Sequence, residues 1–314
     1  MTPHWATAKV ASSRAQELLA LDFTEPVEQE FPQSAADMIA FGFPSPVAIY
    51  DYEEAAGNVL DHVGSNDLTP GGAGTLLQNR TAVGLWDGSS MTGYKCVEMH
   101  DEKASPGEYC AAANNTIYDY GANDSFAFLQ VFKVSTGYPI GSRATAAVFA
   151  DNHLLSKVDG TTGYRLRVDG PGNSVLFTLA SGGTFLVPGV SGSFSDGAWH
   201  YALVVVDRTA QLIYLHTDLG NNTSASIVGI GSPSNTTIFT VGWSFDNGNN
   251  VGGCYKYTAV WEGANAEGIQ QADLDAWWKH ASDPTGLLTT MSHSGSMSCE
   301  VASGPLVCDY STDT

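Results

Sequence analysis

From Val47 onward, short runs of aromatic and β-branched residues alternate with clusters of Gly, Asn, Asp and Ser. This alternation is typical of strands joined by turns, so the pattern predicts an all-β domain. Many strands in one chain can each bury a face if they form two packed sheets. We therefore predict an antiparallel two-sheet jelly-roll sandwich over residues 46–285. The strands are expected at residues 47–51, 93–99, 125–134, 145–150, 163–169, 174–180, 200–207, 210–217, 236–243 and 254–262.

The stretch SDGAWHYALVVVDRTAQLIYLHTDLG holds two apolar runs around a polar break, which predicts a hairpin of two long strands. With DRTA as the loop, His200 faces Thr217 and His216 faces Tyr201. Neighbouring pairs on two paired strands point to opposite faces of the sheet, so the two histidines are not expected to hold one metal ion. We interpret the Trp-His pair before the hairpin as a structural feature rather than a catalytic one.

The segments on either side of the sandwich differ from it in character. Residues 1–45 combine an amphipathic helix with a Pro-containing extended segment, and we interpret them as an arm that docks on this domain or on a partner. Residues 286–314 form a Ser/Thr-rich tail that ends in a predicted hairpin. A helix is predicted over residues 265–281 from apolar residues at positions i, i+3, i+4 and i+7: Leu274, Trp277, Trp278 and Ala281.

The spacing of the five cysteines leaves two interpretations open. Cys96 and Cys110 flank a turn-rich loop, and Cys299 and Cys308 flank the predicted hairpin. Two local disulfides with Cys254 left over are one interpretation, and five reduced thiols are the other. The sequence contains no C-x-x-C pair, which argues against a zinc or thioredoxin-like site.

The chain of 314 residues carries 33 acidic and 13 basic residues, a formal net charge of −20. Nucleic acid and anionic membranes bind positive surfaces, so we expect neither as a partner. No run approaches the roughly 20 apolar residues of a membrane span, and the N-terminus lacks the apolar segment of a secretory signal peptide. We expect a protein of a virion surface or of the extracellular space, without membrane insertion.

Five further segments stand in a particular order: YDYEEAAGNVLDHVGSNDLT (50–69), FAFLQVFKV (126–134), LLSKVDGTTGYRLRV (154–168), DGAWHYALVVVDRTAQLIYLHTDLG (196–220), and a strand with a short helix (254–281). Together they resemble the laminin-G-like domains of the concanavalin A-like lectin/glucanase superfamily. The resemblance implies a concanavalin A-like jelly roll that binds glycans, binds proteins or serves as a structural module. Relatives with the same sandwich cleave polysaccharides.

The sequence has no complete match to the catalytic motifs that we considered. Glycoside hydrolysis needs two carboxylates on one surface, roughly 5–10 Å apart. Glu98 and Glu102 of EMHDE could share a strand face, but His100 stands where glycosidases that resemble this fold have Asp. YRLRV lacks the carboxylate of the arginine-glutamate motif in similar polysaccharide lyases, and GVSGS lacks the spacing of a nucleophile elbow. We therefore expect a protein that is not an enzyme.

Calcium is the candidate cofactor. It takes carboxylates and loop carbonyls in flexible, oxygen-rich sites, and many proteins that resemble this fold hold one Ca²⁺ near a sandwich edge. The alternative is that these residues serve the backbone of turns. The candidate ligands are Asp61, Asn66, Asp67 and Asp246.

Glycan binding by this sandwich would use aromatic side chains in or beside loops. The alternative is that these rings belong to the core, because sandwiches also use aromatics inside. The candidates are Trp86, Tyr94, Tyr138, Trp243 and Phe245.

Three functions compete. The first is a non-catalytic structural or attachment protein, a decoration or fibre component of a phage virion that joins protein partners through its N-terminal arm and binds cell-surface glycan. The second is a secreted bacterial carbohydrate-binding module. The third, supported least, is a polysaccharide-cleaving enzyme of the same fold.

Overall fold

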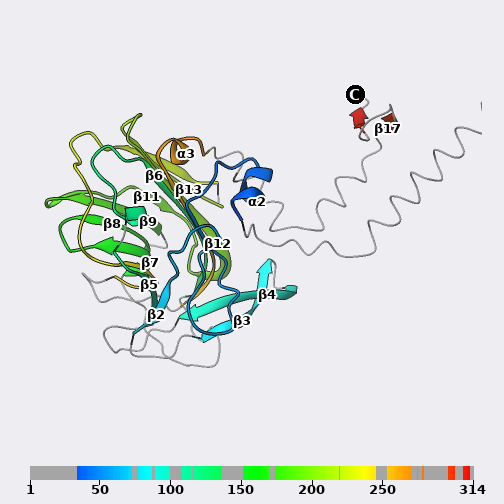
Figure 1. Cartoon of the computed structure of the whole chain (residues 1–314), viewed down its shortest axis with the longest axis horizontal. Coiled ribbons are helices and arrows are strands. Elements are labelled where there is room, and N and C mark those ends of the chain that lie inside the picture. Colours follow the sequence, from blue (N-terminus) through cyan, green and yellow to red (C-terminus); the bar gives the residue numbers. More distant parts are fainter. Residues whose placement is uncertain are drawn as a thin grey trace, which may run out of the picture. The chain divides into compact units, whose positions relative to one another are not determined.

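Two antiparallel sheets of eight strands each form the body of the protein in a computed structural model (Figure 1). The sheets pack on each other as a sandwich, so the predicted all-β fold is confirmed. No helix among the described residues is long and apolar enough to cross a membrane. The structure describes residues 34–72, 77–86, 89–99, 108–114, 116–135, 151–169, 174–218, 220–244, 253–269, 274, 278, 296–300 and 307–311.

The first sheet has the strand order β14-β13-β12-β6-β16-β4-β3, and β1 also pairs with β16. Its strands are β1 (Ala48–Tyr50), β3 (Leu77–Trp86), β4 (Ser89–Met99), β6 (Phe126–Ser135), β12 (Asp196–Asp207), β13 (Leu212–Thr217), β14 (Asn222–Ser226) and β16 (Gly253–Glu262).

The second sheet has the strand order β10-β9-β8-β7-β15-β5-β2, and β11 pairs with β9. Its strands are β2 (Thr69–Gly71), β5 (Tyr109–Ala112), β7 (Asp151–Val158), β8 (Gly163–Asp169), β9 (Ser174–Ser181), β10 (Thr184–Leu186), β11 (Gly189–Ser191) and β15 (Phe239–Val241). The other described elements are α2 (Ala35–Ala40), the 3-10 turn η1 (Thr116–Tyr118), α3 (Gly263–Glu267), β17 (Ser296–Glu300) and β18 (Val307–Ser311).

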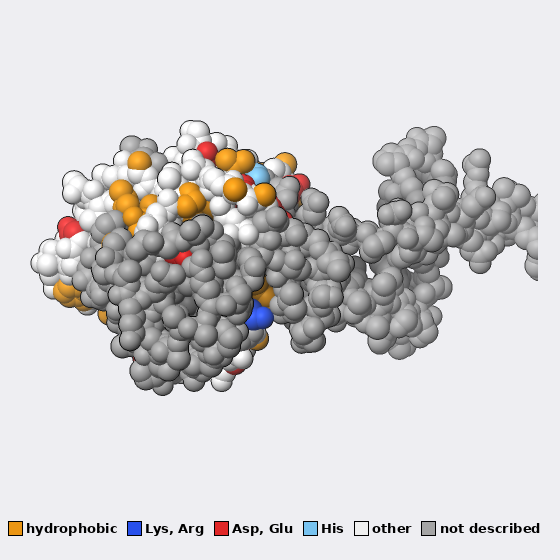
Figure 2. Space-filling view, turned by 90° about the horizontal axis from the view of Figure 1, so that it is seen from below, with side chains coloured by type: hydrophobic (Ala, Val, Ile, Leu, Met, Phe, Trp, Pro, Cys, Tyr) orange, Lys and Arg blue, Asp and Glu red, His pale blue; other side chains and the backbone are white. Residues whose placement is uncertain are grey.

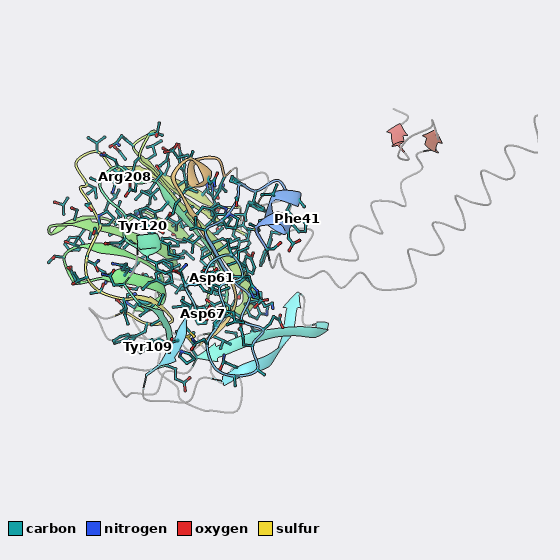
Figure 3. The ribbon with its side chains drawn as sticks, viewed as in Figure 1. Phe41, Asp61, Asp67, Tyr109, Tyr120 and Arg208 are labelled. Carbon is teal, nitrogen blue, oxygen red and sulfur yellow. The ribbon has the colours of Figure 1, made fainter. Side chains whose placement is uncertain are left out.

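Aromatic rings fill the space between the two sheets. Phe126 and Phe128 of β6 meet Tyr164 of β8 in one buried cluster. The ring centroids of Phe128 and Tyr164 are 5.1 Å apart, and Tyr120, which is labelled in Figure 3, stacks on Phe126 with centroids 4.0 Å apart. Burial of each such ring stabilises the fold by roughly 1.5–3 kcal/mol, so this cluster is a main contact between the sheets.

The first sheet is apolar on its outer face as well. Along β12, the even-numbered residues from Ala202 to Val206 face the core between the sheets, and the odd-numbered residues from Tyr201 to Val205 face outward. Both sets are buried. A strand that is buried on both faces has a continuous apolar sequence, which explains the run YALVVV.

Helix α2 and the segment after it contribute to this outer cluster. Ser34 begins the helix, because its hydroxyl accepts a hydrogen bond from a backbone N–H of the first turn. Met38 is fully buried, and Phe43 lies with its ring centroid 6.3 Å from that of Trp261 in β16. The Trp261 indole N–H donates to the carbonyl of Pro44 at 2.8 Å. This part of the predicted arm therefore packs on the sandwich of its own chain.

The predicted C-terminal helix is confirmed in part. Helix α3 begins at Gly263, and the backbone is helical again at Leu274 and Trp278. Leu274 is fully buried, and the Trp278 ring meets Tyr201 edge-on with centroids 5.0 Å apart. Other predicted features lie outside the described residues: Trp277, Ala281, the strand 145–150 and residues 1–33 of the arm.

The hairpin of β12 and β13 has a different register from the predicted one. Its turn is RTAQ rather than DRTA, so Thr217 lies opposite Ala202 and His216 lies opposite Leu203. A shift of two residues leaves every side chain on its predicted face. His200 packs beside rings of the core between the sheets, and His216 stacks on a ring of the outer face. The expectation that the two histidines lie on opposite faces is confirmed.

Cys96 and Cys110 do not form the local disulfide that their spacing suggested. Both are buried free thiols, as is Cys254. Cys96 lies in the outer cluster of the first sheet and Cys110 in the core between the sheets, so the two side chains stand in different layers. Cys299 and Cys308 lie directly opposite each other in the hairpin of β17 and β18, which confirms that hairpin. A disulfide between them stays a prediction.

The docking of the segment after α2 can be tested with two phenylalanines. Phe43 is 2% exposed, whereas Phe41 is 36% exposed. Phe43→Ala should lower the free energy of unfolding by about 3 kcal/mol, because it leaves a cavity against Trp261. Phe41→Ala should lower it by less than about 1 kcal/mol. Urea unfolding measures both values, and equal losses would contradict the docking.

Candidate functional site

A buried carboxylate organises the acidic loop between β1 and β2. Asp61 Oδ1 accepts hydrogen bonds from the backbone N–H groups of Ile49 and Val63 at 3.2 and 3.1 Å. Its Oδ2 accepts from the backbone N–H and side-chain amide of Asn66 at 3.2 and 3.0 Å. The Asp61 N–H in turn donates to Asp67 Oδ1 at 3.0 Å (Figure 3). The loop is thus closed by its own hydrogen bonds.

Three of the four predicted calcium ligands therefore come together, but in a different role. A carboxylate has about four acceptor positions, and four N–H donors occupy those of Asp61. A cation at Asp61 would have to displace these donors. The fourth predicted ligand, Asp246, lies outside the described residues. The geometry favours the turn-forming role, and calcium binding stays a prediction.

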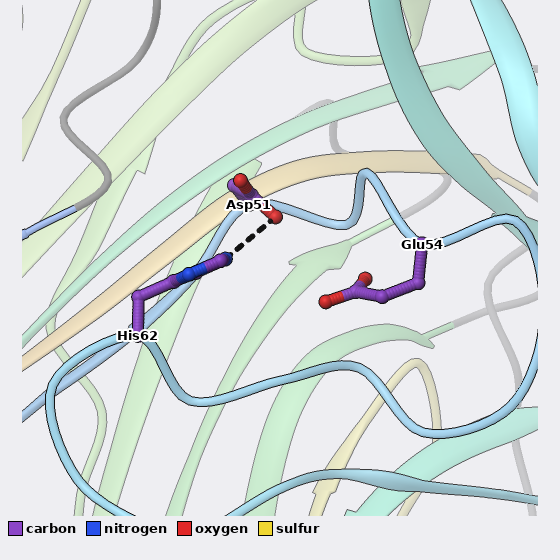
Figure 4. A group of neighbouring side chains, drawn as sticks. All are labelled: Asp51, Glu54 and His62. Carbon is purple, nitrogen blue, oxygen red and sulfur yellow. Dashed lines mark ion pairs between the residues drawn. The ribbon is translucent and has the colours of Figure 1, made fainter.

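Asp51, Glu54 and His62 form a second group in the same loop, which the sequence reasoning missed (Figure 4). Their ligating atoms lie within 4.8 Å of one another. The hydrogen bond from His62 Nε2 to Asp51 Oδ1, 3.1 Å long, raises the pKa of His62. One nitrogen and two carboxylates are a donor set that suits a divalent transition metal. The ion pair already uses two of the three groups, so a metal would have to break it.

Glu54 has one carboxylate oxygen with a hydrogen-bond partner and one without. Its Oε1 accepts the N–H of Leu60 at 2.7 Å, while its buried Oε2 has no hydrogen-bond partner. Burial raises the pKa of Glu54. A raised pKa is typical of a general acid, but the free oxygen is shielded from solvent and from any substrate.

The second sheet presents polar residues on its outer face. In β8 the apolar residues point to the core, and Arg165 and Arg167 point outward. Ser156 of β7 and Thr178 of β9 are the cross-strand partners of Arg165, and Thr240 of β15 lies opposite Ser156. The Arg165 Nε donates to Thr178 Oγ1 at 3.4 Å. The three hydroxyl residues are buried and the two arginines are partly exposed, so a ligand would reach the arginines first.

His153 lies in this polar face and is fully buried. It pairs with Arg167 across β7 and β8, so both side chains point to the same side of the sheet. Neither ring nitrogen has a hydrogen-bond partner. Burial, together with the charges of Arg165 and Arg167, lowers the pKa of His153 to about 3. The imidazole is therefore neutral at neutral pH.

The Trp-His pair leads to a structural clamp, as expected. His200 Nδ1 lies 2.9 Å from Asp218 Oδ2, and its Nε2 lies 3.1 Å from Asp196 Oδ1. Phe132 and Phe194 flank the imidazole ring. Burial alone would lower the pKa of His200, but the hydrogen bonds to Asp218 and Asp196 outweigh burial and raise it. The clamp ties the start of β12 to the end of β13.

Of the five predicted aromatic binding residues, Trp243 is the one whose side chain the structure describes. Trp243 is 5% exposed and stacks on Tyr109 with centroids 5.1 Å apart, so it is a packing residue rather than an exposed binding residue. In the described part of the face in Figure 2, hydrophobic side chains lie in separate small groups. The other candidates are Trp86 and Tyr94, described only by their backbone in β3 and β4, and Tyr138 and Phe245, outside the described residues.

No protein-family model and no curated protein matches the sequence. Solved structures match the fold. The binding domain of Paraclostridial Mosquitocidal Protein 1 is 11% identical with a TM-score of 0.55, over 75% of this chain and 52% of that one. The Botulinum Neurotoxin serotype G binding domain is 11% identical with a TM-score of 0.51, over 74% and 50%. The chain thus spans about half the length of these structures, and the likeness shows a shared β-sandwich fold. The laminin-G resemblance stays a prediction.

The hydrogen bonds to Asp61 predict a large effect of its removal. Asp61→Ala should lower the free energy of unfolding by about 3 kcal/mol, because buried N–H donors lose their charged acceptor. Asp67→Ala removes one accepted hydrogen bond and should cost about 1 kcal/mol. Thermal unfolding measures the loss of unfolding free energy in each variant relative to the wild type. Each loss should be the same with added Ca²⁺ and with a chelator. A loss for Asp61→Ala that occurs only with Ca²⁺ would show that the residue acts through the metal.

The His200 clamp predicts a pH-dependent contribution to stability. The folded pKa lies above the ordinary value of 6.5, so the stabilisation is fully present below pH 6.5 and is lost as the pH rises through the folded pKa. The difference in unfolding free energy between the wild type and His200→Gln should therefore shrink with rising pH. Asp218→Asn should reduce the pH dependence in the same way. A difference that is constant with pH would mean that the ring is held without its charge.

Proposed function

We propose that this chain is a non-catalytic attachment protein that binds glycan through the second sheet of its sandwich. The outer polar face of that sheet is the observation that carries the proposal. The first sheet buries its outer face under an apolar cluster that includes α2, whereas the second sheet carries the partly exposed Arg165 and Arg167 on its outer face. Guanidinium groups are hydrogen-bond donors that can recognise sugar hydroxyls.

The described acidic loop supports the absence of catalysis. Glycoside hydrolysis requires two carboxylates that a substrate can reach. Asp61 is saturated by four donors, Asp51 is held in an ion pair, and the free oxygen of Glu54 is buried. The solved structures that share the fold are themselves named binding domains, which agrees with a binding role.

We propose that this binding takes place at a virion surface, where the protein serves as a decoration or fibre component. The acidic chain and the predicted arm support it, because the arm's first 33 residues would remain for a protein partner while the segment from α2 onward packs in cis. A secreted bacterial carbohydrate-binding module is the alternative. Copurification with capsid or tail proteins supports the first setting, and recovery as a free secreted protein supports the second.

Glycan binding without turnover is the central prediction. The full chain should bind members of a glycan array and release no reducing ends from a polysaccharide panel under the same conditions. The absence of binding to every glycan would contradict the proposal. Turnover that Glu98→Gln abolishes would instead identify an enzyme, since Glu98 is the carboxylate nearest to a glycosidase motif.

A further inference from the structure

The starting point is one carboxylate oxygen in the loop after β1. Buried polar atoms in native proteins almost always have a hydrogen-bond partner, and each exception calls for an explanation. Glu54 Oε2 is buried and has no such partner among the described residues. Figure 4 shows the Glu54 carboxylate pointing toward the ion pair of His62 and Asp51. A proton on this oxygen would itself need an acceptor, whereas a cation held by all three side chains satisfies the oxygen directly.

The spacing of the three side chains fits a single metal ion. His62 Nε2 and Asp51 Oδ1 are 3.1 Å apart, and the ligand atom of Glu54 lies within 4.8 Å of both. Two ligand atoms of a tetrahedral zinc ion, each about 2.0–2.2 Å from the metal, are roughly 3.4 Å apart. The first pair is already close to this spacing. The Glu54 carboxylate, at the end of a flexible side chain, has to move inward by at most roughly 1.4 Å.

Local hydrogen bonds hold the three ligands in place. Asp51 follows β1 directly, and the backbone N–H of His62 donates to the carbonyl of Ile49 in that strand at 3.0 Å. The N–H of Leu60 donates to Glu54 Oε1 at 2.7 Å, which leaves the other oxygen of this carboxylate toward the ion pair. A site that is arranged before its ligand arrives loses little conformational entropy on binding.

The charge around the group favours a cation. The carboxylates of Asp51, Glu54 and Asp61 all act electrostatically on the His62 ring in the direction that favours positive charge. One ammonium group, that of Lys256, acts on Asp51, but it is itself held in an ion pair with another carboxylate. A divalent ion therefore enters a neighbourhood in which negative charge exceeds positive charge.

The donor atoms determine the class of ion. Calcium and magnesium take oxygen ligands, whereas imidazole suits first-row transition metals, and zinc accepts imidazole and carboxylate together. Three protein ligands leave one position of a tetrahedral ion open. The His62 side chain is 26% exposed, so an ion can enter beside it and solvent can fill the open position.

We propose that Asp51, Glu54 and His62 bind a divalent transition-metal ion, with Zn²⁺ as the best match, through one imidazole nitrogen and two carboxylate oxygens. The ion replaces the proton that His62 donates to Asp51, and this proton is released to solvent. The ion also satisfies the buried oxygen of Glu54. Bound in this way, it fastens the loop after β1 through three side chains and stabilises the folded chain. The proposal is independent of glycan binding.

Calorimetric titration of the full chain with Zn²⁺ alone, after treatment with a chelator, tests the site. His62→Gln should weaken the tightest Zn²⁺ binding event by more than about a hundredfold, because the loss of even an outer partner of a metal ligand costs about 10- to 100-fold. Glu54→Gln should weaken it at least about tenfold, while its remaining oxygen can still accept the N–H of Leu60. Titration with Ca²⁺ should give the same result for the wild type and His62→Gln, since calcium does not use the imidazole.

Asp159→Asn is the matched control, since it also removes one carboxylate charge. Asp159 is an exposed residue after β7, and its Oδ1 accepts the N–H of Thr162 at 2.8 Å, which asparagine can do as well. This variant should change the Zn²⁺ affinity by less than about twofold, because an exposed charge outside the site is screened. Equal losses in Asp159→Asn and Glu54→Gln would reduce the effect to general attraction by the acidic chain and overturn the site.

Thermal unfolding gives a second measurement. At a hundredfold excess over its dissociation constant, Zn²⁺ should raise the melting temperature of the wild type by about 5 °C, because it binds the folded chain. His62→Gln should abolish this rise, and its partly exposed position allows the variant to fold, which circular dichroism checks. A wild type that binds no Zn²⁺, or a folded His62→Gln variant that binds it equally well, overturns the site. Neither outcome affects the glycan array, which is run with chelator.

Discussion

Burial of the first sheet on both of its faces is the constraint on which the rest of the structure depends. Its central strands carry apolar side chains inward and outward, as Val204 and Leu203 show in β12. An outward face of this composition is unstable in water, because each exposed side chain forgoes about 25 cal/mol per Å² of apolar area. Chain segments outside the sandwich must therefore fold back, and α2, Phe43 and Leu274 all join the outer cluster.

Because of this burial, the outer faces of the two sheets differ in their side chains. An apolar cluster that includes Trp261 and Tyr257 occupies the outer face of the first sheet, although Lys133 also lies on that face. The second sheet shares only the inner core, and its outward positions are free to be polar. They hold the one buried histidine of the described residues whose two ring nitrogens are both unsatisfied, His153. Proteins tolerate such local conflicts where function requires them, provided that packing elsewhere is sufficient.

The fold was predictable from sequence where local signals decide it. The strand 163–169 was predicted with its observed bounds, because turn residues precede it and its apolar residues alternate. The strand at 151–158 was missed, since it opens with the polar residues Asp151 and Asn152, which read as a loop. The hairpin register was off by two residues, because Gln211 takes a φ of +57° that only the folded turn reveals.

Most of the candidate site could not be predicted from the sequence, because its neighbours are brought together by strand pairing. The arginines of YRLRV were visible, and their shared face follows from their spacing. Their position beside His153 depends on the pairing of β7 with β8, which includes a bulge after His153. Cross-strand neighbours of this kind come from tertiary register and have no local signature. The carboxylate of Asp61 was visible too, but the donors that saturate it come from residues as distant as Ile49.

The acidic excess of the chain acts differently at short range and at long range. Many of the described carboxylates act locally, as Asp61 and Asp218 do when they accept backbone N–H groups. Their repulsion of a distant anion is screened over about 8 Å at physiological ionic strength, whereas arginine acts on a carboxylate at contact. A nucleic acid brings a charge on every phosphate and meets the whole field of −20, which disfavours its binding.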